Sequence, residues 1–277
     1  MSKIRLRESP ITFQVIGDGP PVVLLHGFGG SHTHWDKIVP ELSKSVKVIL
    51  PNLGPLTLGS MKLTFSEQVE MMGDFKRAIF HEFGKFVLVG ISYGAAIAWA
   101  MSSHDDESHI QKLFLINPMP PNPIGNMQSW SLKRLLFMAK WTPLLALYLL
   151  TPLAHWDFHQ VASDIRVDWP TRAPRFSKIF TRRQKMLFHL IHRFSWILKN
   201  ENWKPWWKEV GKIKVPVCIV HGSHDRIFSD HTMRKLRSNF MDSELRTIDR
   251  GTHLAIQSSA REIIALIREF LNMSKAS

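Results

Sequence analysis

Cysteine is nearly absent from this sequence, and its scarcity excludes two kinds of stabilising site. Cys218 is the only cysteine among 277 residues, so neither an intrachain disulfide nor a cysteine-rich metal site can form. Cys218 lies in the apolar run Val215–Val220, where we expect a buried strand thiol. The basic residues after Met1 are followed by no sustained apolar segment, so we expect no secretory signal and a cytoplasmic location.

Long apolar runs are also lacking. The longest one, from Trp141 to Trp156, is interrupted by Pro143, Pro152 and His155. A membrane-spanning helix needs about 20 mostly apolar residues, so this segment is too short and too interrupted to be one. We favour a buried pair of helices here over an interfacial membrane anchor, an alternative that apolarity alone does not exclude.

Acidic residues are few compared with basic ones. The chain has 36 Lys and Arg against 23 Asp and Glu, which gives a net charge of +13 with neutral His. Such an excess suits nucleic acid, an anionic membrane or a negatively charged substrate. Because the basic residues are spread over most of the chain without a nucleic-acid-binding motif, we expect no nucleic-acid partner and keep peripheral contact with an anionic membrane as the alternative.

Short apolar runs alternate with helical patterns along most of the chain, and no linker or repeat interrupts them. The expected strands cover 11–16, 21–25, 46–50, 86–89, 112–116, 215–220 and 245–248, the first two joined as a hairpin through the turn at 17–20. The expected helices cover 34–42, 66–83, 93–102, 231–240 and 259–271. This order predicts an α/β fold with a mostly parallel sheet flanked by helices.

The alternation stops between residues 118 and 212. This segment is rich in Trp, Leu, Lys and Arg and contains no convincing strand. We therefore predict an α/β core formed by residues 1–117 and 213–277, with residues 118–212 inserted as a helical cap. A cap at this point lies over the carboxyl ends of the strands, where open α/β sheets bind their ligands.

One serine lies where a nucleophile is expected. The strand that begins at Phe86 leads into Gly90-Ile91-Ser92-Tyr93-Gly94, and a helical pattern follows. A tight turn from strand to helix strains the backbone, and the glycines at 90 and 94 remove the Cβ atoms that would clash there. We predict that Ser92 is a nucleophile exposed at the top of the sheet.

A serine nucleophile needs a base and an acid that orients the base. Asp225 ends a loop after the expected strand at 215–220, and His253 lies in the loop after the last expected strand. Of the 14 histidines, His253 alone has that position. We predict a triad of Ser92, His253 and Asp225, with Asp230 as the rival carboxylate.

A glycine-rich loop, His26-Gly27-Phe28-Gly29-Gly30, follows the expected strand at 21–25. Backbone N–H groups in such a loop can stabilise the oxyanion of acyl transfer, and we expect the amides of Phe28 and Tyr93 to form the oxyanion hole. We count Gly27 and Gly29 of this loop among the site residues. The loop lacks the residues of a phosphate-binding or dinucleotide-binding loop.

These four segments together resemble the α/β-hydrolase superfamily, in particular its small capped esterases, lipases and C–C bond hydrolases. The resemblance implies an eight-stranded core, a lid, the triad named above, and neither a metal nor an organic cofactor. The segment Asn52–Ser60 departs from the pattern of many relatives, which leaves the conformation of this loop open.

The cap suggests the substrate. Its tryptophans and leucine-rich segments suit an apolar acyl group, so we expect a serine hydrolase that cleaves a hydrophobic, lipid-like carboxylic ester. Three alternatives use the same residues, namely thioester hydrolysis, C–C bond hydrolysis and acyl transfer. A binding protein without catalytic activity is a further alternative, which the complete set of catalytic residue types disfavours. The oligomeric state stays open.

Overall fold

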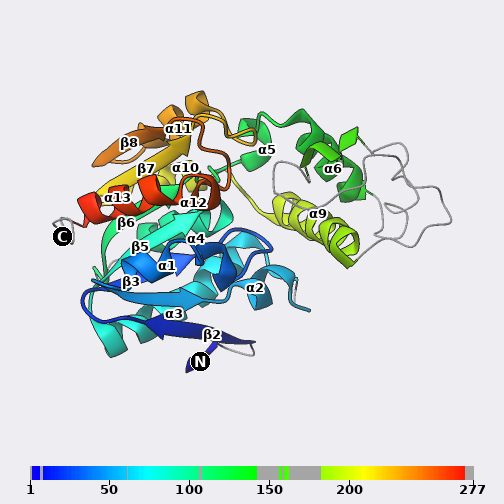
Figure 1. Ribbon diagram of the computed structural model, residues 1–277. Coiled ribbons are helices and arrows are strands. Elements are labelled where there is room, and N and C mark those ends of the chain that lie inside the picture. The colour runs from blue at the N-terminus through cyan, green and yellow to red at the C-terminus, as the bar shows by residue number, and fades with distance from the viewer. Residues whose placement is uncertain are drawn as a thin grey trace.

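Eight strands form one sheet in the order β1-β2-β4-β3-β5-β6-β7-β8. The computed structural model describes residues 2–6, 9–60, 62–105, 108–141, 156–157, 159–161 and 182–271. The strands are β1 (Ser2–Leu6), β2 (Ser9–Ile16), β3 (Pro21–Leu25), β4 (Lys47–Pro51), β5 (Phe86–Ile91), β6 (Ile110–Ile116), β7 (Val217–Gly222) and β8 (Ser243–Ile248). β1 and β2 pair in antiparallel fashion and the remaining pairs from β4 to β8 are parallel, which confirms the expected mostly parallel sheet (Figure 1).

Helices cover both faces of this sheet (Figure 1). In the core they are η1 (His32–Trp35), α1 (Val39–Leu42), α2 (Gly54–Leu58), α3 (Phe65–Phe83), α4 (Tyr93–Ser103), α11 (Asp230–Arg237), α12 (Ala255–Ser258) and α13 (Ala260–Phe270). Along β3, Val23 and Leu25 join the apolar cluster that contains α3 and α4. Val22 and Leu24 join the cluster that contains α1 and α13. Because both of their faces are buried, β3 and β5 are apolar at every position.

The expected hairpin between residues 11–16 and 21–25 is wrong. Strand β4 lies between β2 and β3, antiparallel to the first and parallel to the second. The turn at 17–20 passes beside the start of β4, where the Lys47 amide donates to the Pro20 carbonyl at 3.1 Å. Gly17 has a φ of +80°, and a Cβ on it would lie 2.2 Å from the Ser43 carbonyl oxygen. The glycine therefore allows the turn to pass close to the Ser43 carbonyl, and it does not form a tight hairpin turn.

Two further differences concern local structure. The helix expected over 34–42 is a 3-10 turn followed by the single turn α1, because Pro40 lacks the N–H that a continuous helix would need. The edge strand β1 lies outside the expected strands. The other expected strands and helices agree with the structure to within three residues at either end.

The chain between β6 and β7 includes α5 (Pro123–Asn126), α6 (Trp130–Trp141), α9 (Arg182–Asn200) and α10 (Trp206–Val210). Of these, α6 and α9 project away from the sheet, whereas α10 lies within the core (Figure 1). α6 and α9 pack on each other, and the Ser195 hydroxyl donates to the Leu136 carbonyl at 2.7 Å. α10 instead packs on α4, with the rings of Trp206 and Trp99 5.6 Å apart.

The expected helix pair within 141–156 falls mostly on residues 142–155, outside the described residues. In the part of the chain that the structure describes, no helix combines the length and the apolar character that crossing a membrane requires.

Candidate active site

Ser92 lies at the sharp turn between β5 and α4. Its φ of 53° and ψ of −115° place a non-glycine residue in a strained region of backbone space. Backbone hydrogen bonds hold this conformation, since the Ser92 amide donates to the Ile116 carbonyl and the Ser92 carbonyl accepts from Met119. The turn directs the hydroxyl away from the sheet, as the Gly-x-Ser-x-Gly pattern predicts.

The flanking glycines allow the turn to be this tight. A Cβ on Gly94 would lie 2.4 Å from the carbonyl oxygens of Leu25 and His26, and a Cβ on Gly90 would lie 2.6 Å from the Cα of Ala95. These atoms belong to the backbone and cannot rotate away. The first turn of α4 can therefore approach the end of β3 only if residue 94 has no side chain.

His253 reaches both other members of the predicted triad. The Ser92 hydroxyl donates to His253 Nε2 at 2.8 Å, and His253 Nδ1–H donates to Asp225 Oδ2 at 2.8 Å. The His253 ring is 5% exposed. The structure thus brings together the three side chains predicted from the sequence, from loops 28 and 161 residues apart.

Asp225 is held by its own loop. Its Oδ1 accepts the amides of Ile227 at 2.7 Å and Phe228 at 3.2 Å, which leaves Oδ2 for the histidine. The carboxylate is buried. The two amides fix the orientation of the carboxylate, so that Oδ2 faces His253 Nδ1.

The rival carboxylate takes no part in this arrangement. Asp230 lies in the first turn of α11, where Oδ2 accepts from Arg234 Nε at 2.6 Å. Its side chain is 47% exposed. Of the two carboxylates that the sequence left open, Asp225 and not Asp230 lies next to the histidine.

Asn117 is a buried residue that sequence reasoning missed. Its side-chain amide donates to the carbonyls of Thr252 and His253, each at 2.9 Å. Its Oδ1 accepts the Gly222 amide at 2.9 Å and contacts His221 Nδ1 at 3.2 Å. Asn117 therefore joins the loop of the histidine to the loop of the acid.

One signal could have revealed Asn117. It follows β6 directly, at the carboxyl edge of the sheet, and asparagine tolerates the left-handed backbone conformation better than most residues. Its φ is 42°. A polar residue at this edge, in line with the elbow and the acid loop, is expected to face the site.

The predicted oxyanion residues also lie at the serine. Phe28, Tyr93, Gly27 and Gly29 line the same cavity as Ser92 and His253. Neither the Phe28 amide nor the Tyr93 amide donates to an acceptor within the described ranges of the chain. Both N–H groups are thus available to a bound oxygen atom.

Gly29 has a second role, in the contact with α9. Its φ is +67°, and a Cβ on it would lie 2.0 Å from Cδ2 of Leu190. A Cβ on Gly27, in contrast, would have ordinary van der Waals contacts of 3.7 Å. The lack of a side chain at Gly29 therefore allows α9 to pack against the glycine-rich loop beside the serine.

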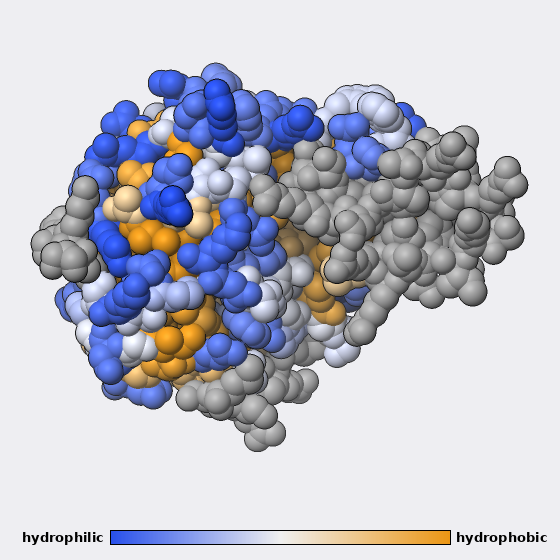
Figure 2. Space-filling view, in the orientation of Figure 1, coloured by the Kyte–Doolittle hydropathy of each residue, from blue (hydrophilic) through white to orange (hydrophobic). Residues whose placement is uncertain are grey.

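The cavity at the serine has a volume of about 200 Å³ and is mostly apolar. Its walls come from the core loops and from α6 and α9, including Met119, Leu132, Leu187, Leu190 and Ile191. In Figure 2 hydrophobic residues, in orange, show at the place that α9 occupies in Figure 1. Such walls suit an apolar group bound next to the nucleophile.

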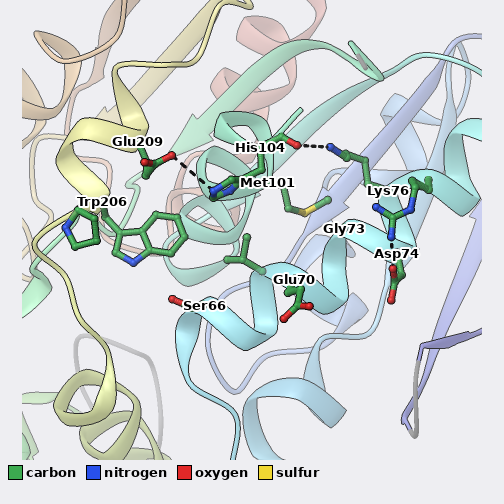
Figure 3. A pocket seen from close by; sticks show the side chains of 12 residues that line it. Ser66, Glu70, Gly73, Asp74, Lys76, Met101, His104, Trp206 and Glu209 are labelled. Atoms are coloured by element: carbon green, nitrogen blue, oxygen red, sulfur yellow. Dashed lines mark hydrogen bonds and ion pairs between the residues drawn. The ribbon is translucent and has the colours of Figure 1, made fainter. Parts of the chain in front are cut away.

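A cavity of about 670 Å³ lies elsewhere, between α3, α4 and α10 (Figure 3). Its charged side chains contact one another or their neighbours, as in the pairs Arg77–Asp74 and His104–Glu209. Its serine, Ser66, donates to Glu201 rather than to a histidine. This larger cavity therefore lacks an activated nucleophile.

His26 fixes the segment that departs from the pattern of many relatives. Its Nε2 accepts the Leu53 amide at 2.9 Å, and Nδ1 lies 2.9 Å from the Gly27 carbonyl oxygen. Only the neutral ring with its hydrogen on Nδ1 makes both bonds. Burial lowers the pKa of His26 from 6.5 to about 4. The loop after Asn52 forms the short helix α2, which the Leu53–His26 bond holds against the glycine-rich loop.

Within the described residues, no group of three or more His, Cys, Asp or Glu side chains is placed to hold a metal ion. Cys218 is buried in β7, as expected. Burial and the nearby Glu244 raise the pKa of this thiol, so it stays protonated at neutral pH.

Comparisons with known proteins agree with this architecture. The model of the α/β-hydrolase fold family matches residues 20–258. The chain is 28% identical to the soluble epoxide hydrolase of Corynebacterium sp. (strain C12) over 105 residues, which is 38% of this chain and 36% of that protein. It is 22% identical to protein ABHD8 of Bos taurus over 258 residues, which is 89% of this chain and 55% of that protein. The chain thus spans about half of these curated relatives or less.

Among solved structures, a thermophilic esterase from Thermogutta terrifontis superposes with a TM-score of 0.68 at 18% identity. The superposition covers 98% of this chain and 97% of the esterase. At this identity the likeness concerns the fold alone.

Asn117 provides the first test of the site. In Asn117→Gly the backbone can keep its positive φ, but the bonds to Gly222 and to the His253 loop are lost. We expect kcat for an activated ester to fall by about tenfold to hundredfold, since small displacements of catalytic groups cost this much, with KM changing much less. Steady-state kinetics measures both constants.

The matched control is Asn122→Gly, because Asn122 also has a positive φ, 53°, but is exposed. It should leave kcat unchanged. An unchanged kcat in Asn117→Gly would refute the positioning role.

His26 provides a test through pH. The folded chain keeps this ring neutral down to a pKa of about 4, whereas the unfolded chain protonates it near the ordinary 6.5. Between these pH values the unfolded state binds more protons than the folded state. The contribution of His26 to the free energy of unfolding is therefore full above pH 6.5 and is lost as the pH falls toward 4. The loss amounts to about 3 kcal/mol at most.

Urea unfolding at several pH values, for the wild type and His26→Gln, measures this contribution as the difference between the two proteins. That difference should shrink as the pH falls. His224→Gln, at an exposed histidine, should keep the wild-type pH dependence. A difference that does not change with pH would contradict the neutral, buried state of His26.

Proposed function

The chain belongs to the α/β-hydrolase family, and we propose that it is a serine hydrolase that cleaves carboxylic esters with apolar acyl groups. One observation carries this proposal: the chain of two 2.8 Å hydrogen bonds from Ser92 through His253 to Asp225. Ser92 lines an apolar cavity together with Phe28 and Tyr93, whose amides donate to no acceptor among the described residues. Such an arrangement has the parts that acyl transfer needs.

In the first step the Ser92 hydroxyl attacks the ester carbonyl carbon. His253 Nε2 takes the hydroxyl proton, and Asp225 stabilises the imidazolium that forms while keeping Nδ1–H directed away from the serine. The bond lengths of 2.8 Å at both nitrogens permit this transfer without movement of the ring.

The attack places negative charge on the carbonyl oxygen. The amides of Phe28 and Tyr93 are proposed to bind this oxygen, and one such donor stabilises the transition state by about 3 kcal/mol. Tyr93 is also the first residue of α4, so the positive end of the helix dipole points at the oxyanion.

Collapse of the intermediate releases the alcohol, which takes its proton from His253, and leaves the acyl group on Ser92. A water molecule then attacks the acyl-enzyme, with His253 accepting the proton from water. The second tetrahedral intermediate expels Ser92, to which the histidine returns the proton. Serine, histidine and carboxylate thus regain their initial state.

The lining of the cavity supports an apolar acyl group. Of its residues, Leu132 comes from α6, Leu187 and Ile191 come from α9, and Met119 follows β6. Among the described residues that line the cavity there is neither lysine nor arginine. This described part of the lining is apolar and carries no cation, so we propose neutral acyl groups for this cavity.

The same catalytic atoms would also hydrolyse a thioester or a C–C bond, or transfer the acyl group to another acceptor. The match to the epoxide hydrolase covers only 38% of this chain, so its substrate is not part of the proposal. Analysis of the products, acid and alcohol for an ester, separates these reactions.

The nucleophile is tested by covalent labelling. A fluorophosphonate probe should label Ser92 alone, since only an activated serine attacks the phosphorus centre. Ser92→Ala should lose the label, and Ser92→Ala and His253→Ala should each lower kcat by several powers of ten. Asp225→Asn should lower kcat by about 10⁴, because the histidine then adopts the wrong tautomer.

Ser102→Ala is the matched control, because Ser102 lies on the same helix and its hydroxyl donates to the Ala98 carbonyl. It should keep both the label and the rate. Label on another residue of the folded protein, or full activity of Ser92→Ala, would refute the serine mechanism.

The acyl group is tested with esters of increasing chain length. For p-nitrophenyl esters, kcat/KM should rise about fourfold with each added methylene until the cavity is full, because a buried methylene stabilises binding by about 0.8 kcal/mol. Initial rates under kcat/KM conditions give the series. A rate that falls from acetate onward would contradict an apolar acyl-binding cavity.

A further inference from the structure

Helix α6 has an exposed apolar face opposite the one that packs on the protein. The inner face is buried and contains Leu132, Leu135 and Leu136. On the outer face Trp130 is 65% exposed, Phe137 66% and Trp141 65%. Phe137 lies seven positions after Trp130, about two helical turns, and Trp141 lies four positions after Phe137, so the three rings share one face of the helix.

Cations surround the aromatic rings of this stripe. The guanidinium of Arg134 lies 5.3 Å from the Trp130 ring centre, and its Nε also pairs with Asp157 at 3.1 Å. Lys140 lies 4.9 Å from the ring centre of Trp141. Lys199, from α9, reaches the same Trp141 ring at 4.9 Å. The outer face of α6 thus combines large apolar rings with positive charge, and we call Trp130, Arg134, Phe137, Lys140, Trp141 and Lys199 the outer cap surface.

Large exposed apolar residues are scattered over the core of the protein. They include Val15 and Ile16 on strand β2 and Met241 in the turn before β8. None of these is aromatic. Single exposed apolar residues are ordinary, but a contiguous patch of aromatic side chains on a helix marks an interaction site.

The residue types of the outer cap surface indicate what kind of partner it binds. Tryptophan together with Lys and Arg is the combination that lies at the boundary between lipid head groups and acyl chains. A net charge of +13 opposes contact with a second copy of this chain and favours an anionic surface. We propose that the outer cap surface docks on an anionic lipid bilayer, with the rings of Trp130, Phe137 and Trp141 in the interfacial layer and with Lys140 and Lys199 against the lipid phosphates.

The position of this surface relates it to the cavity at Ser92. Leu132, on the inner side of α6, lines that cavity. A bilayer on the outer side would thus lie one helix away from the acyl-binding walls. Docking itself rests on the outer cap surface and does not require the proposed chemistry.

The test is vesicle binding by the full chain carrying Ser92→Ala, so that no lipid ester is consumed. Sedimentation with vesicles of phosphatidylcholine alone, and of phosphatidylcholine mixed with phosphatidylglycerol, measures the partition coefficient. We expect strong binding only to the anionic vesicles, a blue shift of tryptophan emission on binding, and weakening by salt.

Two sets of variants identify the surface. Trp130→Gln, Phe137→Gln and Trp141→Gln combined should abolish the binding. Lys140→Glu with Lys199→Glu should lower the partition coefficient by about tenfold or more, since each basic residue near an anionic bilayer contributes about fivefold. Circular dichroism and thermal midpoints check that each variant is folded.

The matched controls lie on the core. Met241→Gln replaces a side chain that is 74% exposed, and Lys85→Glu reverses an exposed charge at the amino end of β5. Both should bind vesicles as the parent does.

Three results would overturn the proposal. They are equal binding to neutral and anionic vesicles, unchanged binding of the triple glutamine variant, and a dimer in sedimentation velocity that this variant loses while vesicles are not bound. Because the parent carries Ser92→Ala, failure of docking leaves the proposed hydrolysis untouched, and failure of hydrolysis leaves docking testable.

Discussion

The site depends on the close approach of one helix end to one strand end. α4 begins against the last carbonyls of β3, and Gly94 permits contact distances at which any Cβ would clash with backbone oxygen. The strained turn at Ser92 follows from this approach, because the chain must reverse between strand and helix within a single residue. The backbone bonds of Ser92 to the loop after β6 counteract the strain. A rigid nucleophile is the result, and the remaining residues of the site are placed relative to it.

Around this turn, buried hydrogen bonds align loops that come from different strands. Asn117 connects the loop after β7 with the loop after β8, and the amides beside Asp225 leave one carboxylate oxygen for His253. Each of these polar groups is buried, so loss of one partner leaves the other unsatisfied. The network therefore specifies one arrangement of the loops. His26 does the same for α2 through its bond to Leu53.

Helix α6 combines two roles. On α6, Leu132 faces the cavity while Trp130 and Trp141 face outward between cations. An amphipathic helix normally has one apolar face, and the second one on α6 is what distinguishes it from a helix that only closes the core. The sequence alone could not separate these faces, because Trp, Leu and Lys are interleaved throughout the segment 118–212.

The amino-acid sequence predicts the α/β alternation, the elbow at Ser92 and the chain order of serine, acid and histidine, because these features depend on local periodicity and on residues adjacent in the chain. Three features are seen only in the folded chain. β4 lies between β2 and β3, Asp225 rather than Asp230 binds the histidine, and Asn117 bonds to the loop of His253. Contacts between residues distant in sequence set the strand order, the hydrogen-bond partner of a carboxylate and the groups that a buried side-chain amide binds. Local patterns contain no information about those contacts.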